Sequence, residues 1–434
     1  MNEVIVGIIG LAVVLILFLT GIELAFAMIA IGFLGFGYLI SWDAALNLLA
    51  KDFFDVLNSY GFTVIPLFIL MGQVAFNSGI AKRLFDAAYK YIGHIPGGLA
   101  MATVAGATAF KSICGSSPAT AATFASVAVP EMERYGYDKR LSTGIVSSVG
   151  TLGVLLPPSV TLIIFGIITD QSIGRLFLAG ILPGLMIAAF FVAIVYGWCK
   201  INPKIGPKGP KSSWSERIKA VPEIGWVVLV FVLVIGGILK GFFTPTEAGS
   251  VGTFLVLLLT FGKRDLNFKG YLKSVMESVC TACMVLMLIA GSTVLGHFIA
   301  VTKIPMIAAD WIVSLPLHPA IIMIFISLIY LVGGSFIDDL AFMILATPIF
   351  FPAIQQLGYN PLWFGMMIGI TVMIGVVVPP VAINVFVVKQ ITKIPFGVIY
   401  SGVYPFLISL VVGGIVLFVF PQLATWLPNM LMPG

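Results

Sequence analysis

Long apolar segments, separated by short polar ones, run through almost the whole chain. An apolar stretch of about 17 or more residues is long enough to cross the hydrocarbon core of a bilayer. Such stretches lie near residues 4–20, 24–40, 62–80, 141–169, 177–198, 224–239, 246–261, 274–299, 362–388 and 397–420. The pattern predicts an all-α protein that crosses a membrane many times.

Three other segments depart from this simple pattern. The segments near 98–128 and 318–351 are apolar but are interrupted by Gly, Ser and Pro, around Cys114–Thr120 in the first and Gly333–Asp339 in the second. Each interruption predicts a helical hairpin with its tip at membrane depth, where only protein or a water-filled cavity can satisfy the backbone. The segment near 43–60 is too polar to span and is predicted to be an interfacial arm.

Gly, Pro and Tyr residues recur at one fixed spacing in the two halves of the chain. The pairs, each 222 residues apart, are Pro130 and Pro352, Gly136 and Gly358, Tyr137 and Tyr359, Gly153 and Gly375, Pro157 and Pro379, Pro158 and Pro380, Gly180 and Gly402, and Pro183 and Pro405. Proline removes a backbone donor and clashes with the preceding turn, so each Pro-Pro pair is predicted to break a helix. Paired broken helices in repeated halves indicate the binding site of a transporter.

Composition and charge placement add a location and an orientation. With 60% hydrophobic and 9% charged residues among 434, the chain is an integral membrane protein surrounded by lipids. The net charge of +5 does not indicate a nucleic-acid partner, because in membrane proteins Lys and Arg mark the cytoplasmic side. The basic clusters lie at 82–90, 134–140, 200–219, 263–273 and 389–393. All of them are cytoplasmic only if the two hairpins are re-entrant from opposite sides, which predicts an inverted repeat with both termini outside.

These features divide the chain into five parts. We expect scaffold helices and the arm in 1–61, the first repeat in 62–198, a cytoplasmic loop with scaffold helices in 199–273, the second repeat in 274–420 and a C-terminal segment in 421–434. Hairpin 1 (98–128) and the broken helix 141–169 belong to the first repeat. Hairpin 2 (318–351) and the broken helix 362–388 belong to the second.

Oxygen atoms at the tips and breaks are candidate ligands for a small cation. Carbonyl groups just before each Pro-Pro pair lose their usual donors, and the tips add hydroxyl groups. The candidates are Ser116, Ser117, Gly150, Thr151, Gly153 and Leu156 in the first half, and Gly334, Ser335, Thr371, Val372, Gly375 and Val378 in the second. The alternative for the Gly and Thr residues is that they only permit close helix packing.

Ionisable residues at the tips are few. A carboxylate near the bilayer centre costs about 2.5–3.5 kcal/mol, so Asp338 and Asp339 are functional candidates. We assign Asp338 to a sodium site and expect Asp339 to cap the second arm of the hairpin. Lys111 either meets an anionic substrate or, the reading we favour, extends to the surface.

The remaining Cys, His and Ser residues give no support to an enzyme, and the repeat disfavours a channel. Cys280 and Cys283 are expected to be buried packing residues, since free Cys behaves as a small hydrophobe. No His pair with metal-ligand spacing and no Ser-His or paired-Asp motif on facing spans is evident, so an intramembrane enzyme is not expected. A channel is disfavoured because two broken, inverted halves suit alternating access.

At these residues the chain resembles the large membrane subunit of the tripartite ATP-independent periplasmic (TRAP) transporters. The resemblance rests on the motifs at 115–123, 155–159, 172–184 and 378–386. It implies Na⁺-driven import of an organic anion bearing a carboxylate, such as a sialic acid or a C4-dicarboxylate, by an elevator motion in the bacterial inner membrane. It also implies a small membrane subunit of about four spans and a periplasmic substrate-binding protein.

Substrate contacts are expected mainly within these motifs. The candidates are Ser117, Thr120, Pro158, Ser159, Pro380 and Asn384, together with Lys111. The nearest alternative function is a stand-alone divalent-anion/Na⁺ symporter, which shares hairpins and inverted repeats but needs no binding protein. The sequence does not decide which carboxylate is carried.

Overall fold

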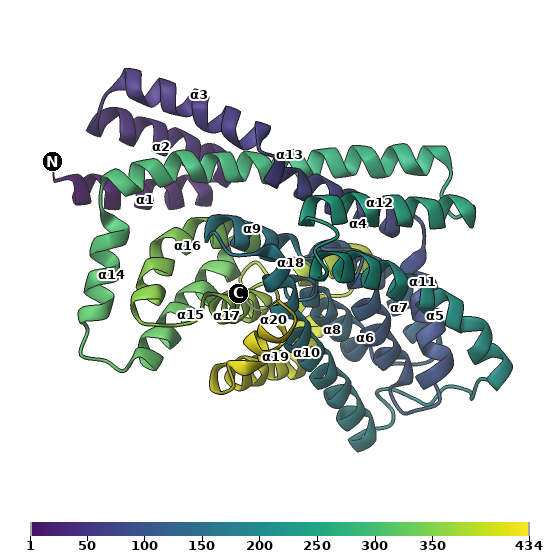
Figure 1. Cartoon of the computed structure of the whole chain (residues 1–434). Helices are drawn as coiled ribbons and strands as arrows, with labels where there is room; N and C mark the ends of the chain where they lie inside the picture. Colours follow the sequence, from purple (N-terminus) through teal and green to yellow (C-terminus); the bar gives the residue numbers. More distant parts are fainter. Residues whose placement is uncertain (1, 433–434) are drawn as a thin grey trace.

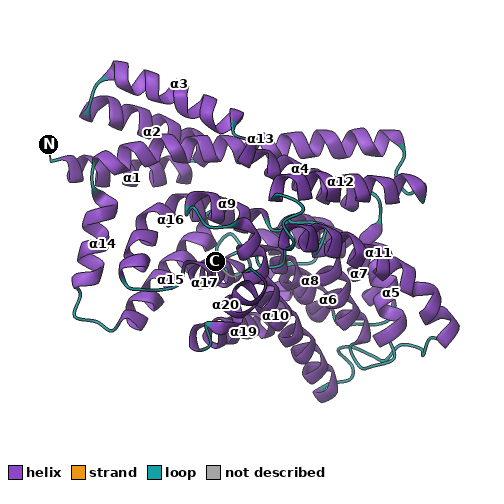
Figure 2. Ribbon diagram, in the orientation of Figure 1, coloured by secondary structure: helices purple, strands orange, loops and turns teal. Residues whose placement is uncertain are grey.

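The computed structural model describes residues 2–432, and all regular structure in that range is helical (Figure 2). Two short 3₁₀ helices are η1 (Tyr60–Thr63) and η2 (Gly150–Val154). The α-helices are α1 (Glu3–Leu19), α2 (Leu24–Leu39), α3 (Trp42–Asn58), α4 (Val64–Asn77), α5 (Ile80–Ile92), α6 (Gly98–Lys111), α7 (Ser117–Arg134), α8 (Lys139–Val149), α9 (Val160–Ile168), α10 (Ile173–Ile201), α11 (Trp214–Leu239), α12 (Pro245–Gly262), α13 (Phe268–Val301), α14 (Ile304–Ser314), α15 (Pro319–Phe336), α16 (Asp339–Gln356), α17 (Pro361–Gly375), α18 (Ile383–Thr392), α19 (Phe396–Val419) and α20 (Gln422–Leu431).

The helices form two layers. The long helix α13 runs across the top of Figure 1, with α1, α2 and α3 along one end and α4 and α12 along the other. The hairpins and broken helices lie in the layer below. Small residues bring the upper helices together, because a Cβ at Gly32 would lie 2.7 Å from the Leu295 backbone nitrogen, and one at Gly291 would lie 2.7 Å from the Ala25 oxygen. We call the upper layer the scaffold; it includes α4 and most of α13, which the sequence analysis counted with the two repeats.

The repeat predicted from Gly, Pro and Tyr spacing is present in the helices. Both ends of α16 lie 222 residues after those of α7 (Ser117–Arg134 and Asp339–Gln356). The starts of α15, α17, α18 and α19 follow those of α6, α8, α9 and α10 at the same spacing to within one residue. The all-α architecture with two hairpins and two broken helices is therefore confirmed.

The hairpin tips are short, and each ends at the N-cap position of its second helix. In hairpin 1, residues 112–116 separate α6 from α7, and the Ala119 amide donates to Ser116 Oγ at 3.3 Å. In hairpin 2, α15 continues through Gly333, Gly334 and Ser335 to Phe336, so only the second part of the interruption predicted at 333–339 leaves the helix. The break is Ile337 and Asp338, with Asp338 at the N-cap position of α16.

Both broken helices stop at their Pro-Pro pair. In the first half, α8 tightens into the 3₁₀ turn η2 and the helix resumes at α9, whose N-cap Ser159 accepts from the Leu162 amide at 3.4 Å. In the second half, residues 376–382 separate α17 from α18. The Pro157–Pro158 and Pro379–Pro380 bonds are both cis. The breaks therefore lie where the prolines predict them.

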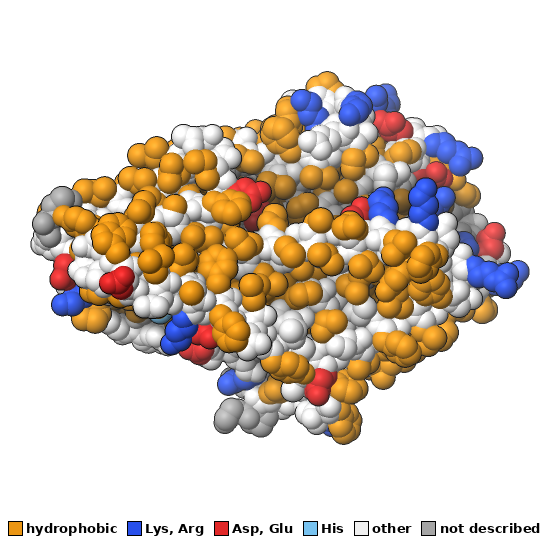
Figure 3. Space-filling view, turned by 90° about the horizontal axis from the view of Figure 1, so that it is seen from above, with side chains coloured by type: hydrophobic (Ala, Val, Ile, Leu, Met, Phe, Trp, Pro, Cys, Tyr) orange, Lys and Arg blue, Asp and Glu red, His pale blue; other side chains and the backbone are white. Residues whose placement is uncertain are grey.

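Seven helices in the described range are long and apolar enough to cross a membrane. Apolar side chains are spread over the whole face shown in Figure 3, whereas most of its Lys and Arg side chains gather toward one end. Helix α3 lies beside α2 and α13, and its position at a membrane interface stays a prediction. Cys280 and Cys283 are exposed, so the expectation that they are buried is wrong; both lie on a face of α13 that points away from the core.

Candidate substrate and cation site

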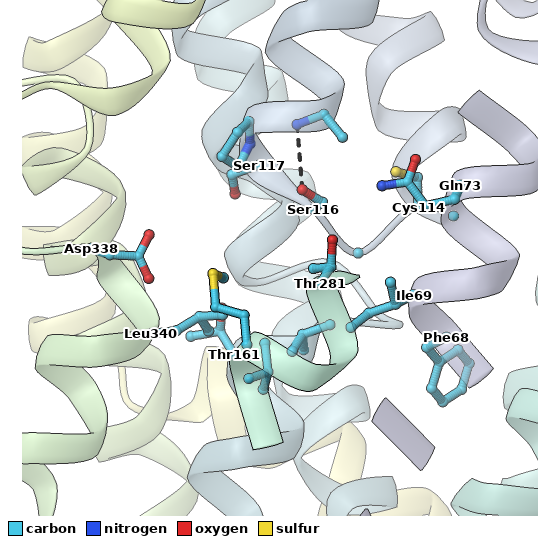
Figure 4. Close-up of a pocket in the computed structure, with 17 residues that line it drawn as sticks. Phe68, Ile69, Gln73, Cys114, Ser116, Ser117, Thr161, Thr281, Asp338 and Leu340 are labelled. Carbon is cyan, nitrogen blue, oxygen red and sulfur yellow. Dashed lines mark hydrogen bonds between the residues drawn. The ribbon is translucent and has the colours of Figure 1, made fainter. Parts of the chain in front are cut away.

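A cavity of ≈ 210 Å³ lies where the two hairpin tips meet the scaffold. Hairpin 1 contributes Cys114–Ala119, hairpin 2 contributes Asp338 and Leu340, and α9 contributes Val160 and Thr161. Figure 4 shows Asp338 on one side of the cavity, facing Ser116 and Ser117, with Gln73 of α4 beyond them. The cavity therefore joins both halves of the repeat to the scaffold.

Three helix N-termini open onto this cavity. Its wall includes residues from the first turns of α7, α9 and α16. The N-terminus of a helix carries a partial positive charge and free backbone N–H groups, both of which favour an anion. Three such ends around one small space make it suited to a carboxylate.

Asp338 places a carboxyl group in the same wall. A second carboxylate bound nearby would be repelled unless a cation lay between the two groups or one of them were protonated. The predicted division of roles put the N-cap on Asp339, but the N-cap position belongs to Asp338. The side chain of Asp339 lies outside the described residues, so its predicted capping role lies there too.

The tip of hairpin 1 packs on the broken helix of its own half. A Cβ at Gly115 would lie 2.9 Å from the Pro158 carbonyl oxygen. A Cβ at Gly150 would lie 3.2 Å from the Ser117 oxygen and 2.9 Å from Asn384 Nδ2, so α18 of the second half also reaches this point. These approaches leave no room for side chains at either glycine.

Asn384 carries an oxygen with unused hydrogen-bonding capacity. Its amide Nδ2 donates to the Ser147 carbonyl at 3.2 Å. Its Oδ1 is buried and accepts no hydrogen bond from the described part of the chain. This oxygen belongs to the amide group whose Nδ2 lies beside Gly150, and a buried carbonyl oxygen without a donor is chemically suited to a small cation.

Lys111 does not extend to the surface, so the reading we favoured from the sequence is wrong. Its side chain is 0% exposed, and Nζ donates to the Ser116 carbonyl at 2.6 Å. The ammonium group lies over Gly153 in η2, where the missing side chain makes room for it. Lys111 is not among the residues that line the cavity.

Hairpin 2 packs on the other broken helix in the same way. A Cβ at Gly375 would lie 2.8 Å from the Gly334 carbonyl carbon and 3.2 Å from the Ser335 nitrogen. The Val381 amide donates to the Ser335 carbonyl at 3.2 Å, which ties the tip to the residues after the Pro-Pro pair. Each tip therefore rests against the break of its own half, as the repeat predicts.

The hydroxyl groups of the other predicted ion ligands bond to carbonyls of their own helical segments. The hydroxyl groups of Thr151 and Thr371 donate to the Ser148 and Met367 carbonyls at 2.7 and 2.9 Å. Leu156 packs on Gly184 of α10, and its amide donates to the Leu152 carbonyl. The second-half residues behind the tip are Val372, whose Cα would lie 4.0 Å from a Cβ at Gly334, and Val378, whose amide donates to the Ile374 carbonyl.

Of the residues predicted to contact substrate, Ser117 lines the cavity. Thr120 donates to the Ser116 carbonyl at 3.0 Å, and Ser159 donates to the Val154 carbonyl at 2.8 Å. These two side chains, with Pro158 and Asn384, lie behind the cavity wall, and Pro380 is exposed elsewhere. The cavity wall is therefore formed by the hairpin tips and not by the Pro-Pro pairs.

Scaffold residues that the sequence did not single out complete the wall. They are Phe68, Ile69, Gly72 and Gln73 of α4, and Thr281, Met284 and Val285 of α13. Gln73 and Thr281 are polar residues within long apolar helices, which is the only signal the sequence carried for them.

Sequence comparisons place the chain among known transporters. Residues 11–423 match the family model of the tripartite ATP-independent periplasmic transporter, DctM component. The chain is 34% identical to the C4-dicarboxylate TRAP transporter large permease protein DctM of Pseudomonas aeruginosa, over 91% of this chain and 92% of that protein. It is 31% identical to the sialic acid TRAP transporter large permease protein SiaM of Vibrio cholerae, over 96% of this chain and 97% of that protein.

A solved structure supports the fold. The crystal structure of the YdaH transporter of Alcanivorax borkumensis superposes with a TM-score of 0.64 at 11% identity, and the match covers 88% of each chain. At that identity the similarity concerns the fold alone. The family match and the two permease relatives decide the class, which is a transporter component and not an enzyme. The chain belongs to the large permease (DctM) family of the tripartite ATP-independent periplasmic transporters.

Proposed function

We propose that this chain imports a small organic anion bearing carboxylate groups, coupled to Na⁺, after a periplasmic binding protein delivers it. The observation that carries the proposal is the cavity between the hairpin tips, which combines three helix N-termini with the carboxyl group of Asp338. The N-termini suit the anion, and the carboxyl group suits a co-transported cation.

The size of the cavity favours a compact substrate. Its ≈ 210 Å³ lies below the range of about 300–1,000 Å³ typical of pockets for drug-sized ligands. One relative is named for C4-dicarboxylates and another for sialic acid. Because the space between the tips is small and its polar groups are few, we place a C4-dicarboxylate ahead of a sialic acid.

Two places suit Na⁺. The first lies at hairpin 2, where Asp338 offers a carboxylate and the Gly334 carbonyl oxygen lies beside Gly375; the Ser335 carbonyl also accepts from the Val381 amide. The second lies around Gly150, near the Ser117 carbonyl oxygen and the side-chain amide of Asn384, and its oxygens are all neutral. Na⁺ at either place would fasten a tip to its broken helix, so ion binding and substrate binding would be coupled.

The layered fold supports an elevator motion. The cavity is bounded by α4 and α13 of the scaffold on one side and by the tips and α9 on the other. A site at such a boundary can be carried across the membrane when the lower layer slides against the scaffold. We place the protein in the inner membrane, with both termini on the periplasmic side and a small membrane subunit docked on the scaffold.

The test is uptake of radiolabelled succinate into proteoliposomes that contain this chain and the small subunit. An inward Na⁺ gradient is imposed, with and without the binding protein. Uptake that needs both Na⁺ and the binding protein supports the proposal. Uptake with Na⁺ alone would identify a stand-alone symporter, and uptake driven equally by a proton gradient without Na⁺ would refute sodium coupling.

A further inference from the structure

Lys111 places its side-chain nitrogen inside the first half of the repeat. Its side chain is 0% exposed at the last residue of α6, and Nζ donates to the Ser116 carbonyl at 2.6 Å. A Cβ at Gly153 would collide with the ammonium nitrogen and would lie 2.7 Å from Cε. The ammonium group therefore lies between the tip of hairpin 1 and the backbone of η2.

The surroundings of this ammonium group are those of a cation site. The C-terminal ends of α6 and α8 both lead into this region, through the tip residues and through η2. A helix C-terminus carries partial negative charge and carbonyl groups without intrahelical partners. In transporters with broken helices, unwound carbonyls and such ends coordinate the coupling ion. The lysine ammonium is a compact point charge and can take the place of such an ion.

The second half has the opposite chemistry at the equivalent positions. At the repeat spacing, Lys111 corresponds to Gly333 and Ser116 corresponds to Asp338. A Cβ at Gly333 would collide with the Phe342 ring, so an apolar side chain fills the place of the lysine stem. The first half thus carries a lysine and a neutral N-cap, and the second carries a glycine and a carboxyl group.

We propose that the Lys111 ammonium is a tethered cation that fills an ion position between the Ser116 carbonyl and Gly153, so that this chain binds one Na⁺ fewer than it would with a neutral residue there. The inference rests on the proposed cation-coupled transport. It changes the stoichiometry, because a tethered charge moves with the carrier in both directions and adds nothing to the net charge carried per cycle.

The test counts Na⁺ on the purified full-length chain, which needs no knowledge of the substrate. Binding of ²²Na⁺ is measured for the wild type, Lys111→Ala and Lys111→Ser, at constant ionic strength with choline as the replacing cation. Lys82→Ala is the matched control, because it removes one positive charge from an exposed position of α5. Thermal unfolding followed by tryptophan fluorescence gives a second readout.

We expect one additional Na⁺ per chain in Lys111→Ala and Lys111→Ser, and none in Lys82→Ala. We also expect Na⁺ to raise the melting temperature of the two Lys111 variants by about 2–4 °C more than that of the wild type. An unchanged Na⁺ count in whichever Lys111 variant folds overturns the inference. A wild type that binds no Na⁺ while a Lys111 variant binds one refutes the proposed sodium sites but supports the tethered cation.

Discussion

Replacing Gly375 by Ala tests whether the close contact between hairpin 2 and its broken helix controls ion binding. The added Cβ would lie 2.8 Å from the Gly334 carbonyl carbon and 3.0 Å from its oxygen, whereas ordinary contacts are 3.4–4 Å. Both atoms belong to the backbone of the tip, so no side-chain rotation relieves the clash. The tip must move away by about 0.6 Å, the difference between 2.8 and 3.4 Å.

The size of the effect follows from that displacement. Overpacking of a well-packed region typically costs about 1–3 kcal/mol. If this cost falls on the closed, ion-bound arrangement, Na⁺ affinity decreases by about 5- to 150-fold. Helix propensity would act in the other direction, since Ala is favoured over Gly in the last turn of α17. A loss of Na⁺ affinity in Gly375→Ala would therefore have a steric cause.

The assay is the Na⁺ concentration that gives half-maximal uptake in proteoliposomes. Gly236→Ala in α11 is the matched control, because a Cβ there meets nothing within 4 Å. We expect the half-maximal concentration to increase for Gly375→Ala and to stay at the wild-type value for Gly236→Ala. A Gly375→Ala value within about twofold of the wild type would refute the link between the tip contact and the ion, because the cost of about 1 kcal/mol or more predicts a larger change.

Three further predictions concern single charges and the broken helices. Asp338→Asn keeps a good N-cap residue but removes the carboxylate, so we expect a folded protein without Na⁺-dependent uptake; full sodium dependence would contradict the assignment. Pro157→Ala and Pro379→Ala restore a backbone donor at the breaks and should raise the half-maximal Na⁺ concentration about 2- to 10-fold, and no change in either would mean that the prolines only shape packing. The Arg140 side chain, hydrogen-bonded to Asp138 at the start of α8, lowers the pKa of that carboxyl group, so the folded state binds its proton less tightly than the unfolded state. This stabilisation is present above the unfolded pKa of about 4 and is lost as the pH falls through the folded value, so melting temperatures should fall more steeply on acidification in the wild type than in Asp138→Asn.

The sequence predicted the architecture because its strongest signals are prolines, whose effect on a helix comes from their own covalent structure. Proline cannot donate from its nitrogen, so Pro157-Pro158 and Pro379-Pro380 place both helix breaks without knowledge of the packing. The break in hairpin 2 is shorter than the interruption predicted at 333–339, because Gly333, Gly334 and Ser335 only weaken a helix, and packing against α17 and its neighbours keeps them helical. The nearest N-cap residue, Asp338, marked the boundary more accurately.

The site was predicted less completely than the fold. Ser116, Ser117 and Asp338 could be predicted, because a hairpin tip at membrane depth needs protein or a water-filled cavity around its polar groups. All three line the cavity. The direction of the Lys111 side chain depends on Gly153, which is 42 positions away in the sequence and opens space only in the folded chain. The contributions of Thr281 and Gln73 depend on how α13 and α4 cross the hairpins, which no local pattern encodes.

The exact correspondence of α7 and α16 has a consequence for how such a protein can change over generations. The two halves share one helical arrangement, which depends on helix lengths, prolines and glycines. The side chains at the tips can differ between the halves, because each depends on a single residue. Ser116 and Asp338, like Lys111 and Gly333, show that matched positions in the copies hold unlike groups. A lineage can therefore change the charge at one tip by a single substitution while the helices of both halves keep their frame.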